Sequence, residues 1–200
     1  KVTGVKATLI YTVFEKKGAI TRSVKVENQT DKPFYIDTIH SLCVDLPGYD
    51  YDMLGLYGRW VKERALDRYP LHRGIQSIKS KRGSSSHNHN PFTALVSKNA
   101  TEDYGDCYGF NLVYSSNFSI DVEVDGFASS RLVMGINPEG FSWLLNPGEE
   151  FYSPEAVMIY TDKGIGEMSH MFHRLYSNNL VRGKWKKAKR PLLINNWEGT

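Results

Sequence analysis

Three acidic residues at alternating positions are the first group that could do chemistry. Asp121, Glu123 and Asp125 are spaced two residues apart, so on a β-strand their carboxylates would point to one face of the sheet. Carboxylates arranged in this way could hold a hard cation. The residues that alternate with them are Ile and Val, which is the pattern of a half-buried strand. The sequence therefore favours a solvent-facing acidic stripe over a cation site.

Histidines suggest a second kind of site, for a transition metal. His87 and His89 would share one side of an extended chain, and His40 or His72 could complete a ligand set. The sequence has no cysteine partner at zinc-finger spacing and no HExxH motif. No metal site is therefore predicted.

Groups for nucleophilic or acid–base catalysis are present only as residue types. Serines 84–86 precede His87, but the GxSxG elbow is absent, and serine is common in Gly-rich turns. A glycosidase needs two carboxylates that flank the scissile bond. The sequence pairs none of the acidic residues that lie mostly in its turns, namely Asp45, Asp50, Asp52, Glu102, Asp103 and Asp106.

The two cysteines carry no signature of a reactive thiol. Cys43 and Cys107 each lie in an apolar, strand-like run. Sequence alone cannot decide whether they form a disulfide. So few cysteines in a chain of 200 residues favour two buried free thiols.

Two tryptophans stand outside the periodic apolar runs. Trp60 and Trp197 sit among polar residues, whereas Trp143 lies in the apolar run FSWLL and is predicted to be a core residue. An exposed Trp ring can stack on the apolar face of a sugar. The residues alone leave two interpretations open for Trp60 and Trp197, namely sugar stacking and packing at a domain interface.

Mainly β-strands would position these side chains. Alternating apolar residues over 5–13 and 20–26, with a turn at 15–18 between them, predict a hairpin. A further strand-like run covers 34–46. Short β runs bounded by Gly, Asn, Pro or Asp return later, at 92–96, 108–114, 118–124, 131–136, 141–145 and 156–160. About ten such strands predict a sandwich rather than βαβ units.

The remaining segments are of different kinds. Residues 48–90 lack clear periodicity and are predicted to be a long excursion with at most one or two strands, of the type that often serves function. Apolar residues at helical spacing predict a helix over about 165–175. A basic segment over 182–190 and a lone strand over 192–195 follow.

Composition narrows the possible partners. Two hundred residues suffice for one domain with a core. The formal net charge of +3 is too small to predict a nucleic-acid partner, and the basic residues of 182–190 read as a solvated linker rather than a polyanion site. No apolar run approaches the length of a transmembrane helix, so no membrane partner is predicted.

Several motifs, taken in order, resemble bacterial α-galactosidases of glycoside hydrolase family 36. The most specific are RGSSSH at 82–87 with NPF at 90–92, and RPLLINNWE at 190–198. The resemblance covers nearly the whole chain, and its other motifs are YDYD at 49–52, LYGRW at 56–60, MGINP at 134–138 and WLL at 143–145.

The resemblance implies a mainly β fold of three parts. Residues 1–162 would form a β-supersandwich (a galactose-mutarotase-like sandwich) that is incomplete at its N-terminus. Residues 163–189 would be one C-terminal helix and a basic linker leading toward a (β/α)8 barrel. Residues 190–200 would be the first strand of that missing catalytic barrel, with Trp197 at the end where barrel active sites lie.

The resemblance also implies an activity for the parent protein. It would be a retaining α-galactosidase that hydrolyses terminal α-galactosides such as melibiose and raffinose, without a cofactor or metal. Both catalytic aspartates would come from later barrel strands, so the 200-residue chain is expected to be inactive. Its role would be to wall the substrate pocket through Trp60 and Trp197 and to assemble subunits.

Further expectations concern the oligomeric state, the partners, the compartment and the alternative functions. The resemblance implies a homotetramer that binds α-galactoside oligosaccharides. The parent protein is expected to be cytoplasmic, with neither a nucleic-acid nor a membrane partner. The alternative from another class is a stand-alone carbohydrate-binding β-sandwich module that uses Trp60. A third is a structural scaffold in which Trp60 and Trp197 only pack at an interface.

Overall fold

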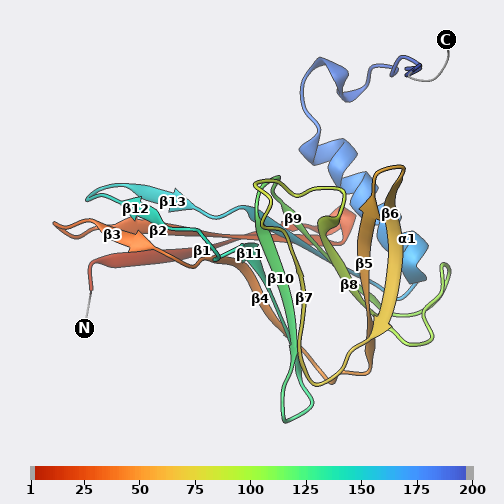
Figure 1. Cartoon of the computed structure of the whole chain (residues 1–200), viewed down its shortest axis with the longest axis horizontal. Coiled ribbons are helices and arrows are strands. Elements are labelled where there is room, and N and C mark those ends of the chain that lie inside the picture. Colours follow the sequence, from red (N-terminus) through yellow and green to blue (C-terminus); the bar gives the residue numbers. More distant parts are fainter. Residues whose placement is uncertain (1–2, 197–200) are drawn as a thin grey trace.

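The structure is a computed structural model that describes residues 3–196. Its largest feature is an eight-stranded antiparallel sheet (Figure 1). The strand order is β1 (Val5–Phe14), β2 (Ala19–Asn28), β14 (Glu155–Thr161), β9 (Cys107–Val113), β8 (His89–Ser97), β5 (Tyr51–Arg59) and β6 (Lys62–Pro70), with β13 (Glu150–Tyr152) also paired to β2. The 3-10 turn η1 (Glu15–Lys17) closes the β1–β2 hairpin, as the alternation and turn residues predict.

A smaller sheet lies against one face of the large one. It runs in the order β4 (His40–Leu46), β11 (Ser130–Ile136), β10 (Phe118–Val124) and β7 (Gly74–Lys79). A two-stranded flap pairs β12 (Trp143–Leu145) with β3 (Phe34–Ile36). The predicted mainly β sandwich is confirmed.

The main core fills the space between the large sheet and the smaller sheet. On β10, Ile120 and Val122 are fully buried and face Phe110 and Leu112 of the large sheet in one apolar cluster. Asp121 and Glu123 alternate with them and point outward, because successive side chains of a strand face opposite sides. The predicted acidic stripe is therefore confirmed for these two residues.

The single long helix covers the opposite face of the large sheet. In α1 (Gly164–Leu175), Met168, Phe172 and Leu175 are buried over β14 and β9. The π-turn η2 (Tyr176–Leu180) and the 3-10 turn η3 (Lys184–Lys186) follow it. Among residues 3–196, no helix is long and apolar enough to cross a membrane.

The helix begins on the loop between β8 and β9 rather than on a capping side chain. The backbone N–H groups of Ile165 and Gly166 donate to the carbonyl oxygens of Thr101 and Glu102, each at 2.9 Å. Gly164 has a φ of 80°, and a Cβ there would lie 2.5–2.6 Å from backbone atoms of that loop. Only glycine fits this approach, so the loop fixes where the helix starts.

The prediction of at most one or two strands in 48–90 is wrong. The region contains β5, β6, β7 and the start of β8. The period-two signal is missing for two opposite reasons. β5 is buried on both faces around Met53 and Leu54, whereas most of β6 is exposed on both faces at the edge of the sheet.

Smaller expectations also need correction. The run 34–46 is two strands, β3 and β4, and β13 was not predicted. Trp143 is not a core residue: it is 49% exposed and packs beside Phe151, with ring centroids 5.3 Å apart, because the flap is only two strands wide.

The cysteine prediction is half right. Both thiols are free, but only Cys107 is buried. Cys43 lies between Leu42 and Val44 on β4 and therefore faces away from the core.

The segment after η3 differs from the predicted strand. Residues 191–196 are irregular, and the side chains of Leu192, Leu193 and Ile194 are 99%, 92% and 88% exposed. A strand needs neighbours for its backbone N–H and C=O groups, and residues 192–195 pair with none of the described strands. Trp197 lies outside the described residues.

Candidate functional site

Trp60 occupies the two-residue turn of the β5–β6 hairpin. Its side chain is 82% exposed, as its polar neighbours predict. The other turn residue, Val61, has a φ of 65°, and its N–H donates to Oε1 of Glu63 at 3.1 Å. The turn is therefore held from within, and the indole ring is free to meet a flat, partly apolar surface.

A close backbone contact ties this hairpin to the loop before β8. The N–H of Gly58 donates to the carbonyl oxygen of Asn88 at 3.3 Å. A Cβ on Gly58 would lie 2.8 Å from Cα of Glu63 and from O of Lys62, and 2.9 Å from O of His87. Since no other residue fits this space, Gly58 sets the direction of the tip that carries Trp60.

Two β-bulges occur at the same level as Gly58. Between Tyr57 and Arg59, strand β6 has one extra residue, and Arg64 there takes a φ of 57°. Between Gly55 and Tyr57, strand β8 has two extra residues next to Pro91, which cannot donate to the ladder. Bulges redirect side chains. Here Arg64 of β6 and Asn90 of β8 both line one polar hollow.

The hollow has a volume of about 440 Å³. It is lined by the two bulge residues and by side chains from the hairpin and the RGSSSH loop: Glu63, Arg64, Ser85, Ser86, His87 and Asn90. The hairpin tip, this loop and the C-terminal arm after α1 all extend toward the upper end of the molecule in Figure 1.

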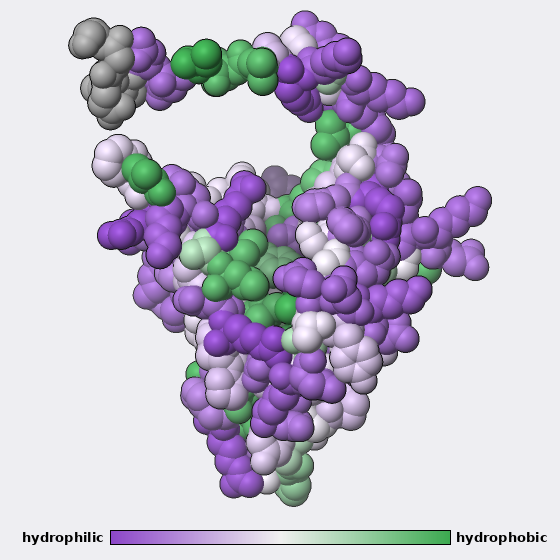
Figure 2. Space-filling view, turned by 90° about the vertical axis from the view of Figure 1, so that its right-hand side faces the viewer, coloured by the Kyte–Doolittle hydropathy of each residue, from purple (hydrophilic) through white to green (hydrophobic). Residues whose placement is uncertain are grey.

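An apolar groove of about 630 Å³ adjoins the hollow and shares Arg64 and Asn90 with it. Its walls are α1 and the outer faces of β5, β6, β8 and β9, including Leu56, Leu66 and Phe92. Figure 2 shows apolar side chains gathered on this side of the molecule, beneath the arch of the C-terminal arm. The polar hollow and the apolar groove thus form one continuous surface with a polar part and an apolar part.

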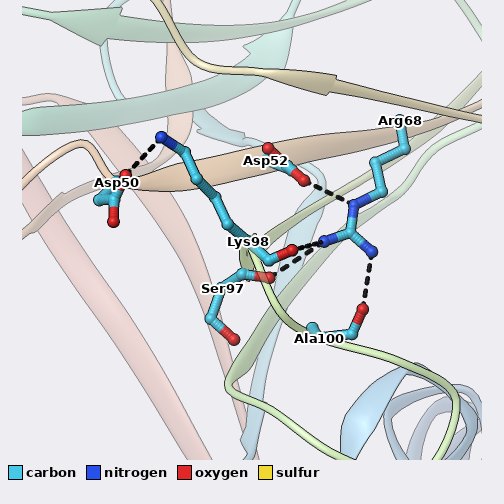
Figure 3. Close-up of polar contacts among 6 residues, drawn as sticks. All are labelled: Asp50, Asp52, Arg68, Ser97, Lys98 and Ala100. Carbon is cyan, nitrogen blue, oxygen red and sulfur yellow. Dashed lines mark hydrogen bonds and ion pairs between the residues drawn. The ribbon is translucent and has the colours of Figure 1, made fainter.

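Below the groove, Arg68 on β6 clamps the loop that receives α1 (Figure 3). Its guanidinium donates to Oδ2 of Asp52 at 2.6 Å and to the carbonyl oxygens of Ala100 at 2.7 Å, Lys98 at 2.8 Å and Ser97 at 3.1 Å. A planar fork with five donors is suited to gathering several acceptors. Through three backbone carbonyls, this one side chain ties the loop that receives α1 to strand β6.

Four of the six acidic residues considered as catalytic groups are engaged in other pairs. Asp45 accepts from Arg131 at 2.6 and 2.9 Å, which holds the pKa of that carboxyl below its usual value. Asp106 accepts from the hydroxyl of Tyr160 at 2.6 Å, and this hydrogen bond raises the pKa of Tyr160 to about 12. These are structural pairs rather than a catalytic dyad.

The side chains considered as metal ligands are not brought together in the described residues. Among residues 3–196, no three His, Cys, Asp or Glu side chains gather so that they could hold a metal ion. Burial lowers the pKa of both His40 and His89, which favours the neutral form of each ring. His89 packs edge-on to Tyr57, at 5.2 Å between ring centroids, which is a packing role.

Comparison with known proteins identifies relatives of the whole chain. Residues 1–146 match the family described as the glycosyl hydrolase family 36 N-terminal domain, and residues 150–200 match the family described as Melibiase. The chain is 49% identical over 197 residues to alpha-galactosidase AgaA of Geobacillus stearothermophilus, and 40% identical over 200 residues to alpha-galactosidase Mel36A of Lactobacillus acidophilus. These alignments cover 98% and 100% of this chain, but only 27% of each relative.

Solved structures agree. The AgaA structure in complex with stachyose superimposes with a TM-score of 0.93 at 49% identity, covering 97% of this chain and 27% of that one. The alpha-galactosidase of Lactobacillus brevis gives a TM-score of 0.95 at 40% identity, covering 98% and 26%. The β-supersandwich fold implied by the sequence motifs is thereby confirmed. The chain belongs to glycosyl hydrolase family 36, and it corresponds to about a quarter of the length of the relatives it matches.

Proposed function

We propose that this chain is the N-terminal, non-catalytic region of a retaining α-galactosidase that hydrolyses terminal α-galactosides of the melibiose and raffinose type. The observation that supports this most is the match over nearly the whole chain to enzymes with that activity in their names. One relative has been solved with raffinose and with stachyose. The catalytic aspartates of the double displacement would lie on the barrel that follows in the parent enzyme.

Within that enzyme, this region would line one side of the substrate pocket and contribute to contacts between subunits. Trp60 would offer its exposed ring to a sugar, and Trp197 would border the galactose pocket at the mouth of the first barrel strand. Leu192–Ile194 would form part of that strand, since their exposed apolar side chains would be buried if the segment paired with a neighbouring sheet. We further propose a homotetramer in the cytoplasm.

The first test is the hydrolysis of p-nitrophenyl α-galactoside by this chain and by the chain extended through the catalytic barrel. We expect only the extended protein to turn over. Turnover by the 200-residue chain would mean that its own carboxylates are catalytic, and inactivity of both would refute the substrate class.

The role of Trp60 is tested in the extended protein. Trp60→Ala should raise KM about 3–10-fold, the loss of one aromatic contact, while leaving the midpoint of urea unfolding nearly unchanged because the ring is exposed. Phe127→Ala is the matched control, since Phe127 is a 93% exposed aromatic at the β10–β11 turn. A loss of stability or assembly without a change in KM would instead support the scaffold role.

A further inference from the structure

The polar hollow beside Trp60 has unused hydrogen-bonding capacity. Within residues 3–196, the guanidinium of Arg64, the ring of His87 and the hydroxyl of Ser85 make no hydrogen bond or ion pair. Glu63 uses one carboxylate oxygen for the turn, and Asn90 uses its amide N–H for the carbonyl of Leu56 at 3.3 Å. One oxygen of each side chain therefore stays available as an acceptor.

This arrangement is held by the backbone rather than by the flexible side chains. Arg64 and Asn90 face the hollow because both sit at bulges in neighbouring strands. The loop that carries Ser85 and His87 is fixed from two sides. Its Ser85 N–H donates to the carbonyl of Ser115 at 3.0 Å, and Asn88 accepts from Gly58. A backbone fixed in this way favours binding, since less conformational entropy is lost when a ligand makes contact.

The set of groups favours a neutral ligand rich in hydroxyls. Each sugar hydroxyl both donates and accepts, so it needs cationic or N–H donors together with carboxylate or carbonyl acceptors. Arg64 supplies the donors, and Glu63 and Asn90 supply the acceptors. The carboxylate of Glu63 counts against a phosphate or another anion. Trp60 lies in the turn directly before Glu63 and Arg64, where its ring could cover the apolar face of the same ligand.

We infer that this hollow is a sugar-binding subsite that takes one hexose unit of an oligosaccharide, with Arg64 and His87 as its principal donors. The choice of an oligosaccharide as ligand rests on the proposed function. The binding itself depends only on residues of this chain, so it is measured separately from hydrolysis.

The experiment titrates the full 200-residue chain with stachyose and follows binding by saturation-transfer NMR. Arg64→Asn removes the guanidinium but keeps a residue that tolerates a positive φ. We expect the dissociation constant for stachyose to rise about tenfold in Arg64→Asn and in His87→Ala, the effect of one lost hydrogen bond. Arg73→Asn is the matched control, because Arg73 is exposed and lies outside the hollow, and it should stay within twofold.

Three outcomes would overturn the inference. They are no binding of stachyose by the unmodified chain, binding that neither variant weakens, and binding of inorganic phosphate instead, lost in Arg64→Asn. Circular dichroism confirms that each variant is folded, and His87→Ala tests the hollow without altering the bulge. Hydrolysis of p-nitrophenyl α-galactoside by the extended protein decides the proposed function independently of any of these results.

Discussion

Replacing Arg68 should weaken the fold more than its place near the surface suggests. Arg68→Ala removes four hydrogen bonds from a guanidinium whose side chain is 30% exposed. The exposed ion pair with Asp52 is worth about 0.5 kcal/mol. The bonds to the carbonyls of Ser97 and Lys98 are also exposed. Because water can replace each of them, each is likewise worth about 0.5 kcal/mol.

The bond from Arg68 to the carbonyl of Ala100 is the costly one. It is partly buried, so that losing it strands an acceptor and costs about 1.5 kcal/mol. Together these losses predict that the free energy of unfolding falls by about 3 kcal/mol, or about 6–12 °C in Tm for a domain of this size. Arg68→Lys should recover only about 1 kcal/mol of this loss, because an ammonium cannot reach both Asp52 and the carbonyl oxygens of the loop.

Urea unfolding of the 200-residue chain measures this loss, with Arg73→Ala as the control for removing an exposed arginine. Hydrogen exchange adds a second readout. The amides of Ile165 and Gly166 donate to Thr101 and Glu102, which follow Ala100 directly, so these amides should exchange faster in Arg68→Ala. A loss below 1 kcal/mol, or unchanged exchange at both amides, would refute the clamp.

Three further predictions follow from other contacts. Gly58→Ala should cost about 1–3 kcal/mol in urea unfolding, because its Cβ would meet backbone atoms at 2.8–2.9 Å, whereas a Cβ at Gly126 would have nothing within 4 Å and Gly126→Ala should be neutral. Equal effects of the two substitutions would refute the close backbone contact at Gly58. Thiol titration of the folded chain at pH 8 should label Cys43 and spare Cys107, whose pKa burial raises to about 11, until denaturant is added; fast labelling of both cysteines would contradict this. Burial, and secondarily Arg82, lowers the pKa of His89 in the folded chain below its ordinary 6.5. The unfolded chain therefore binds the proton more readily, and the stability of the fold decreases as the pH drops below 6.5. His89→Gln should reduce the dependence of the urea midpoint on pH between pH 7 and 5, whereas the control His170→Gln, at an exposed histidine, should leave it unchanged.

The sequence predicts elements well where burial is one-sided. On β10 the alternation of Ile and Val with acidic residues matches a strand with one covered face, and the β1–β2 hairpin follows from the same signal and a turn. β5 and β6 were missed because their environments remove that contrast. Periodicity reports burial, and only indirectly backbone conformation.

The site shows a similar division. The polar neighbours of Trp60 predict an exposed ring, which the structure confirms. The roles of Gly58, Arg64 and Asn90 could not be read from the sequence, since they depend on which residues of β5, β6 and β8 face one another. One local signal did exist: Pro91 inside a strand-like run indicates a bulge or an edge.

The position of β14 has a consequence for the order of folding. This strand pairs with β2 on one side and β9 on the other, so contacts such as Thr21 to Glu155 span 134 residues. During synthesis the β1–β2 hairpin can form early, but it has no neighbour in the large sheet until β13 and β14, within residues 150–161, have emerged.

Until then, β2 and β9 each present an open edge, which is where strands of different molecules pair wrongly. Closing so long a loop late also makes this step slow. The match to the N-terminal family ends at residue 146, before β14 begins. A chain cut at that boundary would retain both open edges permanently, so the smallest unit expected to fold reliably extends at least through β14.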